Sequence, residues 1–264
     1  MQAGAQRSED ANNEAMSELS PIGKFDVIEL RRYTTKQGSR DQFVKYFEAY
    51  FPEAFQQLGA LALGQFRERS DKSSFTWMRG FHTLNDRPIA NSAFYFGPLW
   101  REHRMTINAL LTDSDNVLLL RPLGVEDAVM VLPAVDPVTE QRGANGIVVA
   151  QIFALKSQPD NSQAERIENI FATYRARGVR QAGILTTLDV PNNFPQLPVR
   201  TDGVYLVWLG IVRDEESLNE RVRPLAQSAT EALTSLDMLR DRPELVVLDP
   251  TPRSRLRWLP SWNE

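Results

Sequence analysis

The chain has 264 residues, of which 42% are apolar, 9% aromatic and 24% charged, and this composition excludes disorder along the whole chain and collagen-like repetition. Thirty Lys and Arg residues against 34 Asp and Glu residues leave a net charge of −4, which is too balanced for general affinity to nucleic acid. Cys is absent and His82 and His103 are the only histidines, so we expect no disulfide, no cysteine catalysis and no metal site. The sequence also lacks a glycine-rich nucleotide-binding loop, and we expect no cofactor.

Residues 1–24 show no sustained apolar periodicity, and we expect them to form a disordered N-terminal arm. The arm lacks the apolar core of about seven residues that a signal peptide needs, and Met16 leaves a later natural start open. No apolar run approaches the roughly 18 residues that a membrane span requires. Together with the absence of Cys, these features predict a soluble, cytoplasmic protein without a membrane span.

Between residues 25 and 122, the apolar pattern predicts a unit of the order β-α-β-β-α-β. Gln42 follows Ser39 by three residues, which predicts a capping box at the start of the first helix. Gly97 and Pro98 interrupt the second helical region, and Pro98 is well placed to begin a renewed helix. The expected elements span residues 27–33, 39–58, 61–69, 74–81, 86–111 and 116–120.

The same order returns between residues 146 and 250, after a connector at 123–145 that is rich in Pro and acidic residues. The expected elements span residues 146–155, 163–177, 181–188, 204–212, 217–236 and 245–248. The strand endings VLLLRP at 117–122 and LVVLDP at 245–250 correspond, which indicates an internal duplication. We therefore predict an α+β fold of two tandem ferredoxin-like domains, 25–122 and 146–250, followed by a C-terminal tail at 251–264.

Burial of the two sheets predicts how the halves meet. A four-stranded sheet with helices on one face must bury its other face. The strand at 146–155 is apolar on both faces, as is typical of strands that are covered on both sides. We predict that the two halves pack sheet to sheet around a barrel-like core within one chain. In the tail, residues 252–258 alternate arginine with other residues, and the overall acidity of the chain favours a docked edge segment over contact with an acidic partner or nucleic acid.

Four segments of the first half carry a family resemblance, and they are Glu29-Leu30-Arg31-Arg32-Tyr33, Thr76 to Phe81, Phe94 to Arg104 and Asp113 to Pro122. In order and spacing, the chain from 25 to 122 resembles the NIPSNAP family of the dimeric α+β-barrel superfamily, and 146–250 looks like a diverged second copy. The resemblance implies a ferredoxin-like barrel fold. It also implies relatives such as cofactor-less monooxygenases of the antibiotic-biosynthesis type, which bind small molecules between sheet and helices. It supplies no settled reaction or catalytic residues for NIPSNAP proteins themselves, so fold is carried over and chemistry is not.

The alternation of the first strand places Glu29, Arg31 and Tyr33 on the face opposite Ile28 and Leu30. Other polar and aromatic residues are expected on the same face of the neighbouring strands: Phe75, Trp77, Arg79, Phe81, Gln65 and Arg67. An aromatic cavity with Glu and Arg at its centre suits a small polar or anionic ligand, which Arg could bind and Trp77 could stack on. The alternative is an internal Glu29–Arg79 pair that closes the barrel and binds nothing.

Trp100 and His103 share a helical face with Ile107. We include Trp100 among the ligand-binding candidates and His103 as the candidate general base, with a partly buried packing role as the alternative for His103. His82 follows a predicted strand and is expected to be a loop residue.

The second half lacks this set of charges. Aligning Trp208 with Trp77 places Gly210 near Arg79, and aligning the first strands of the two halves places Gln151 and Phe153 near Glu29 and Arg31. We therefore expect a single site on the first half, with the second half as a built-in partner.

Two classes of function stay open. One is a small-molecule binder, or a cofactor-independent enzyme such as an oxygenase or isomerase, acting on an aromatic or anionic compound in the first-half barrel. The other is a non-catalytic interaction protein whose barrel is filled with side chains. Whether the chain is an enzyme stays undecided at this point, and both a monomer and a homodimer are compatible with the pattern.

Overall fold

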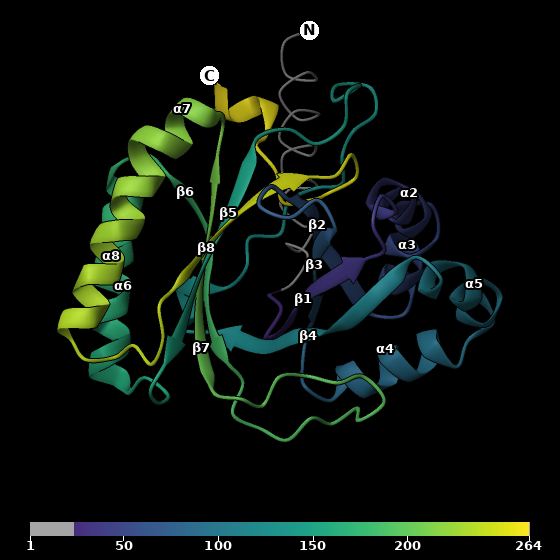
Figure 1. Ribbon diagram of the computed structural model, residues 1–264, viewed down its shortest axis with the longest axis horizontal. Coiled ribbons are helices and arrows are strands. Elements are labelled where there is room, and N and C mark those ends of the chain that lie inside the picture. The colour runs from purple at the N-terminus through teal and green to yellow at the C-terminus, as the bar shows by residue number, and fades with distance from the viewer. Residues whose placement is uncertain (1–23, 264) are drawn as a thin grey trace, which may run out of the picture.

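Eight antiparallel strands form a closed barrel in the computed structural model, which describes residues 24–263 (Figure 1). The strands are β1 (Val27–Thr35), β2 (Ala60–Glu68), β3 (Ser74–Phe81), β4 (Leu111–Pro122), β5 (Ile147–Leu155), β6 (Arg180–Thr187), β7 (Val204–Val212) and β8 (Glu244–Pro250). Around the barrel their order is β1-β3-β2-β8-β5-β7-β6-β4. The predicted arm, apart from Lys24, lies outside the described residues.

The barrel closes where the edge strands of the two halves pair with each other. β2 joins β8 through three residue pairs, of which Arg67 with Asp249 is the middle one. β4 joins β6 through three further pairs, centred on Arg121 with Thr186. Because the edge strands are paired, the sheet closes into one antiparallel barrel. With its helices, the structure is an α+β protein. The two predicted sheets meet along their edges as well as across the core.

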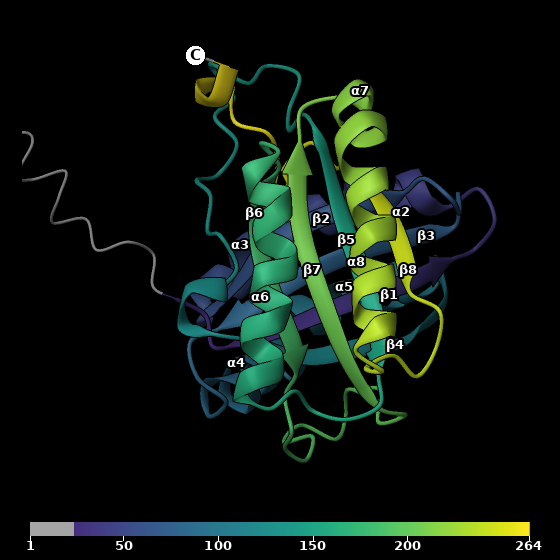
Figure 2. The same cartoon turned by 90° about the vertical axis from the view of Figure 1, so that its left-hand side faces the viewer.

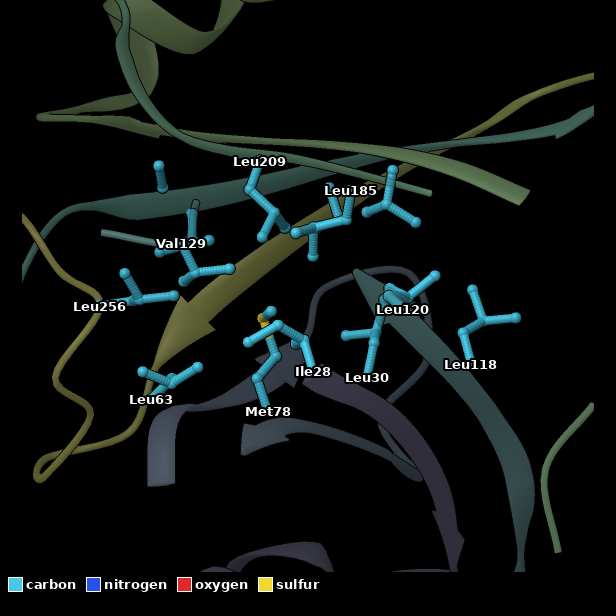
Figure 3. Close-up of a cluster of buried hydrophobic side chains, with 14 of the residues drawn as sticks. Ile28, Leu30, Leu63, Met78, Leu118, Leu120, Val129, Leu185, Leu209 and Leu256 are labelled. Carbon is cyan, nitrogen blue, oxygen red and sulfur yellow. The ribbon is translucent and has the colours of Figure 1, made fainter. Parts of the chain in front are cut away.

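Apolar side chains fill the interior of the barrel. Ile28 and Leu30 of β1 point inward with Met78 of β3, and they meet Leu209 of β7 and residues from β4 and β6 (Figure 3). Each of these side chains is almost completely buried, and burying a Leu or Ile side chain stabilises the fold by about 1.5–3 kcal/mol. The predicted inward face of the first strand is therefore confirmed.

Two groups of helices cover the outer surface of the barrel on opposite sides (Figures 1 and 2). On the first-half strands lie α2 (Arg40–Tyr50), α3 (Pro52–Gln57), α4 (Asp86–Tyr95) and α5 (Pro98–Asn108). On the second-half strands lie α6 (Asn161–Ala176), α7 (Glu215–Ser217) and α8 (Arg223–Ser235), with a π-helical turn at Leu218–Val222 between the last two. Two short 3-10 turns, Val125–Asp127 and Pro260–Asn263, complete the list.

The first predicted helix differs from expectation at both its start and its middle. Ser39 makes no capping hydrogen bond from its side chain, so the predicted capping box is wrong. The helix expected over 39–58 is divided into α2 and α3, which begins at Pro52. Proline has no N–H to donate and its ring clashes with the carbonyl four residues earlier, so it cannot continue a straight helix. The predicted restart at Pro98 is confirmed by α5.

The connector and the tail both dock on the barrel. Met130 donates its backbone N–H to Ala182 of β6, and Val129 joins the apolar core. The tail runs alongside β2, and Leu256 donates its N–H to the backbone carbonyl of Leu63. Arg257 of the tail pairs with the buried Glu140 of the connector, as a docked segment predicts. Within residues 24–263, no helix combines the length and apolarity needed to cross a bilayer.

One carboxyl of the connector is expected to make stability depend on pH. Asp127 is buried and accepts the N–H of Gly124 at 3.0 Å, while Glu168 of α6 lies beside it. Burial, followed by the charge of Glu168, raises the pKa of Asp127 to about 6. Because the folded state then holds this proton more tightly than the unfolded state, stability falls as the pH rises from about 4 through 6.

We therefore expect Asp127→Asn to raise the free energy of unfolding at pH 7 by about 1–3 kcal/mol, since one pKa unit corresponds to about 1.4 kcal/mol. At pH 4 the gain should disappear. Urea denaturation at both pH values measures it, with the exposed Glu165→Gln on α6 as the control. A variant that is less stable than the wild type at pH 7 would contradict the expected sign.

Candidate functional site

A single buried carboxylate, Glu29 of β1, is surrounded by three arginines. Arg31 donates to it from Nη1 at 2.8 Å, and Arg79 of β3, directly opposite in the strand register, donates from Nε at 2.7 Å. Arg87 of α4 donates from Nε to the other carboxylate oxygen at 2.7 Å. All four side chains are at most 2% exposed. The predicted Glu29–Arg79 pair is thus present, as part of a larger cluster.

The cluster carries more positive than negative charge. Burial alone would raise the pKa of Glu29, but the charges of Arg79, Arg31 and Arg87 outweigh it and hold that pKa far below its usual value. Glu29 is the only carboxylate that pairs with these three arginines among the described residues, so two positive charges stay uncompensated. A buried charge without a partner is costly, and an anion placed nearby would lower that cost.

Aromatic rings take the place of some of the missing partners. The two terminal nitrogens of Arg79, and Nη2 of Arg87, have no hydrogen-bond partner among residues 24–263. The guanidinium carbon of Arg79 lies 5.2 Å from the ring centre of Phe55 and 5.7 Å from that of Tyr95, with Trp77 and Phe81 at intermediate distances. Such cation–π contacts stabilise a cation without neutralising its charge.

A cavity of about 230 Å³ lies between the first-half strands and helices α2 to α5. Of the predicted ligand-binding residues, Arg31, Tyr33, Trp77 and Trp100 line it. Glu29 and Arg79 are not in the lining, but Arg79 contacts rings that are. The remaining lining is mostly aromatic and apolar: Phe43, Phe47, Phe51, Phe55, Phe94, Tyr95, Ile107, Asn108, Leu111, Ser114, Asp115, Gln196, Leu197 and Pro198. Four of the six predicted ligand-binding residues therefore line a cavity on the outer, helix-covered side of the barrel, whereas the barrel interior is filled.

Arg31 is the residue that connects the charged cluster to this cavity. Its Nε donates to the hydroxyl of Tyr33 at 2.8 Å and its Nη1 to Glu29. Its Nη2 has no partner among the described residues, and Arg31 lines the cavity. Burial raises the pKa of Tyr33, against the opposing charge of Arg31, so the phenol stays protonated near neutral pH. The arrangement offers an anion one guanidinium N–H donor inside an aromatic enclosure.

The second half supplies one wall of the cavity. Gln196, Leu197 and Pro198, from the loop between β6 and β7, are part of the lining. Arg87 holds this loop, because its Nη1 donates to the side-chain oxygens of Asn192 and Asn193, each at 2.8 Å. The same guanidinium therefore bonds Glu29 through one nitrogen and the loop through another.

Arg87 and this loop were not among the predicted site residues. Arg87, Ala90, Asn91 and Phe94 are buried on α4 at helical spacing, and this pattern is the signal that could have assigned Arg87 to the inner face. The loop lies about a hundred positions away along the chain, and no local pattern connects it to Arg87.

The two histidines lie outside the cavity lining. The Nδ1 of His103 is 2.6 Å from the hydroxyl of Tyr46, and its ring stacks on Tyr50 at 3.9 Å, between α2 and α5. Phe51, which does line the cavity, contacts His103 edge to face. His82 is exposed after β3, where it stacks on Phe25. A base role for His103 stays a prediction.

The matching strands of the second half contain no such cluster. Arg79 and Gly210 each lie two residues after the tryptophan of their strand, Trp77 in β3 and Trp208 in β7. The partner of Arg79 on the neighbouring strand is Glu29, whereas the partner of Gly210 is Val149. The predicted alignment of Gln151 with Glu29 was therefore wrong by two residues, because cross-strand pairing and not the start of a strand sets the register. A Cβ on Gly210 would lie 2.2 Å from the Trp208 ring, which fills the space there.

Comparisons with known proteins find similar solved structures but no matching family. No protein-family model matches the chain, and no curated protein matches it either. A solved structure from Fusobacterium nucleatum, provisionally assigned as a monooxygenase, has a TM-score of 0.59 at 14% identity and covers 90% of this chain and 98% of its own. An anthrone oxidase-like protein gives 0.52 at 8% identity, over 91% and 99%. An uncharacterised NIPSNAP domain protein from Burkholderia xenovorans gives 0.34 at 18% identity, over 36% and 93%.

Structural neighbours thus include the NIPSNAP and monooxygenase-like α+β-barrel proteins that the sequence resembles. Matches of this low identity over nearly the whole chain show that the fold is shared with the monooxygenase-like proteins, and they show the fold alone. Residues 24–263 contain no group of three or more His, Asp or Glu side chains arranged to hold a metal ion.

Proposed function

We propose that the cavity binds a small planar aromatic anion and that the protein is a cofactor-independent enzyme of the oxygenase or isomerase type acting on it. One observation carries the proposal: a buried cluster with two uncompensated positive charges includes Arg31, which lines a cavity with mostly aromatic walls. Trp77 and Trp100 would contact the faces or edges of the ligand ring, while Arg31 would bind its carboxylate, phenolate or enolate oxygen.

The size of the cavity limits the ligand. Sites for drug-sized molecules measure about 300–1,000 Å³, and this cavity measures about 230 Å³. This volume suits a molecule with a single aromatic ring or with two fused rings. Asp115 is exposed in the lining, so the anionic group should point away from it and toward Arg31.

An anionic substrate also suits oxygen chemistry without a cofactor. Holding an enolate or phenolate next to the arginines lowers the cost of removing the proton, and the resulting carbanion can supply electrons to dioxygen. A ring CH2 group and O2 would give a ring C=O and water, which balances without a reductant. The monooxygenase-like neighbours support this class of reaction by analogy of fold only.

His103 stays the candidate base for that proton from the sequence, and it contacts the cavity wall through Phe51 without belonging to the lining. Loss of turnover in a folded His103→Ala variant would support this role, and unchanged turnover would remove it. We also propose that 25–122 and 146–250 are copies of one ferredoxin-like unit, so that the second half takes the place of a partner subunit beside the cavity.

The proposal is tested by native mass spectrometry of freshly purified protein, followed by calorimetric titration. The native mass, compared with the denatured mass, shows whether a small molecule is retained and whether two chains associate. The titration compares 2-naphthoate with 2-naphthamide, which has nearly the same shape and no charge. We expect only the naphthoate to bind well; equal affinity for both, or no binding of either together with a ligand-free native mass, would contradict the proposal.

A further inference from the structure

A second hollow, a groove of about 500 Å³, lies on the other side of helix α3 from the aromatic cavity. Phe55 of α3 lines the cavity, whereas Pro52, Glu53 and Gln56 of the same helix line the groove. The facing wall comes from the connector at 134–143 and from Pro252, Arg253 and Arg255 of the tail. The two hollows therefore share a helix but have different lining residues.

Gln65 of β2 is a buried lining residue of this groove that lacks a partner. The residue belongs to the lining although it is only 1% exposed, and its buried Oε1 has no hydrogen-bond partner among the described residues. Its backbone groups are satisfied by Ser254 and Thr251 of the tail. A buried acceptor without a donor costs about 1–3 kcal/mol. A ligand hydroxyl at this position would supply the missing donor.

Two arginines of the groove also lack an acidic partner. Arg253 pairs with Glu53, and the Glu140 carboxylate is bound through both oxygens by Arg257. Arg255 donates only to neutral groups, the carbonyl of Leu132 at 3.1 Å and the Gln56 side chain at 3.2 Å. Arg142 is exposed and forms no ion pair within residues 24–263.

The local charge is therefore positive where the groove meets the connector and the tail. Burial, followed by the charge of the neighbouring Arg257, lowers the pKa of Arg255 and outweighs the opposing charge of Glu53, which is itself paired with Arg253. An acidic ligand group bound between Arg142 and Arg255 would give each of these arginines the negative partner that it lacks.

We propose that this groove is a second binding site, specific for a small anion that also carries a hydroxyl group. Arg142 and Arg255 bind the acidic group, and Oε1 of Gln65 accepts a hydrogen bond from the hydroxyl. The site is independent of the aromatic cavity, since it uses none of the residues that line that cavity.

Calorimetry at low salt with two matched pairs of probes tests the proposal. Malate and succinate differ by one hydroxyl, and so do 3-hydroxypropyl phosphate and propyl phosphate, and only the first member of each pair carries a hydroxyl. Because a neutral hydrogen bond contributes about 0.5–1.5 kcal/mol, we expect the hydroxylated member of at least one pair to bind up to about tenfold more tightly. Equal affinity within both pairs, or no binding of any probe at millimolar concentration, would overturn it.

Two variants locate the site. Gln65→Leu should abolish the preference for the hydroxylated probe while the probe still binds, and Arg142→Ala should weaken both members of the pair by about two- to fivefold. Arg104→Ala, an exposed arginine on α5, is the matched control and should change neither affinity. If Gln65→Leu does not fold, Arg142→Ala still decides, because unchanged affinity in that variant places any bound anion elsewhere and overturns the proposal.

Discussion

Replacing Glu29 with Gln is expected to lower the free energy of unfolding by about 3–5 kcal/mol at pH 7, the usual cost of removing one partner from a buried ion pair. The amide keeps the shape of the carboxylate but leaves Arg31, Arg79 and Arg87 buried without any negative charge. Urea denaturation followed by tryptophan fluorescence measures the change, and the m-value shows whether the folded state has stayed equally compact.

An exposed ion pair gives the matched control for this experiment. Glu215 pairs with Arg69 and its side chain is 57% exposed, so Glu215→Gln should cost far less than Glu29→Gln. A loss of similar size in Glu29→Gln would mean that the cluster contributes little, and it would remove the charge argument for an anionic ligand.

The pH dependence of the Glu29 effect has a defined sign. The pKa of Glu29 in the folded protein lies well below the ordinary value of 4.5, because the three arginine charges outweigh the effect of burial. The stabilisation that this carboxylate supplies is fully present above the pKa of the unfolded chain and is lost as the pH falls toward the folded pKa. The stability difference between wild type and Glu29→Gln should therefore shrink below about pH 4.5.

The sequence carries enough information for the centre of the site but not for its surroundings. Alternation with a period of two placed Glu29, Arg31 and Tyr33 on one face, and the cross-strand partner Arg79 followed from the order of the strands. These are short-range rules that hold wherever a strand is regular. They also gave the inward face of Ile28, because one face of each strand had to be buried.

Contacts between distant segments were outside the reach of those rules. Arg87 meets Asn192 and Asn193 across more than a hundred positions, so only the closed barrel brings the loop to the cavity. The same limit explains why the sequence could not distinguish an internal Glu29–Arg79 ion pair from a ligand site. Their difference lies in the number of arginines around one carboxylate, and one of the three comes from a helix.

The filled barrel does not decide between binding and a purely structural role. A barrel packed with side chains such as Leu30 and Leu209 was the expectation for an interaction protein, and the interior is packed in this way. The cavity, however, lies in the layer between the strands and the helices, where the second half has Trp208 stacked on Phe171 and a bond from Tyr174 to Gln151 instead. The asymmetry between the two layers is the feature that a structural role leaves unexplained.

Replacing Arg31 with Met is the most direct way to separate ligand binding from folding. Glu29 keeps Arg79 and Arg87 as partners in this variant, so the cluster still pairs its carboxylate and the protein is expected to fold. The affinity for 2-naphthoate should fall by about 10- to 100-fold, because a hydrogen bond to a charged group contributes about 1.5–3 kcal/mol. Calorimetric titration of the purified variant measures this loss.

The neutral probe tells whether the loss comes from charge. Met fills much of the space of the Arg side chain, so weak binding of 2-naphthamide should not change in Arg31→Met. Arg101→Met, an exposed position on α5, should leave the affinity for both probes as in the wild type. A parallel loss of both probes in Arg31→Met would assign Arg31 to the shape of the cavity, and unchanged affinity for 2-naphthoate would place the anionic group elsewhere. Only a selective loss of the anion supports Arg31 as the residue through which the excess charge of the cluster acts on a ligand.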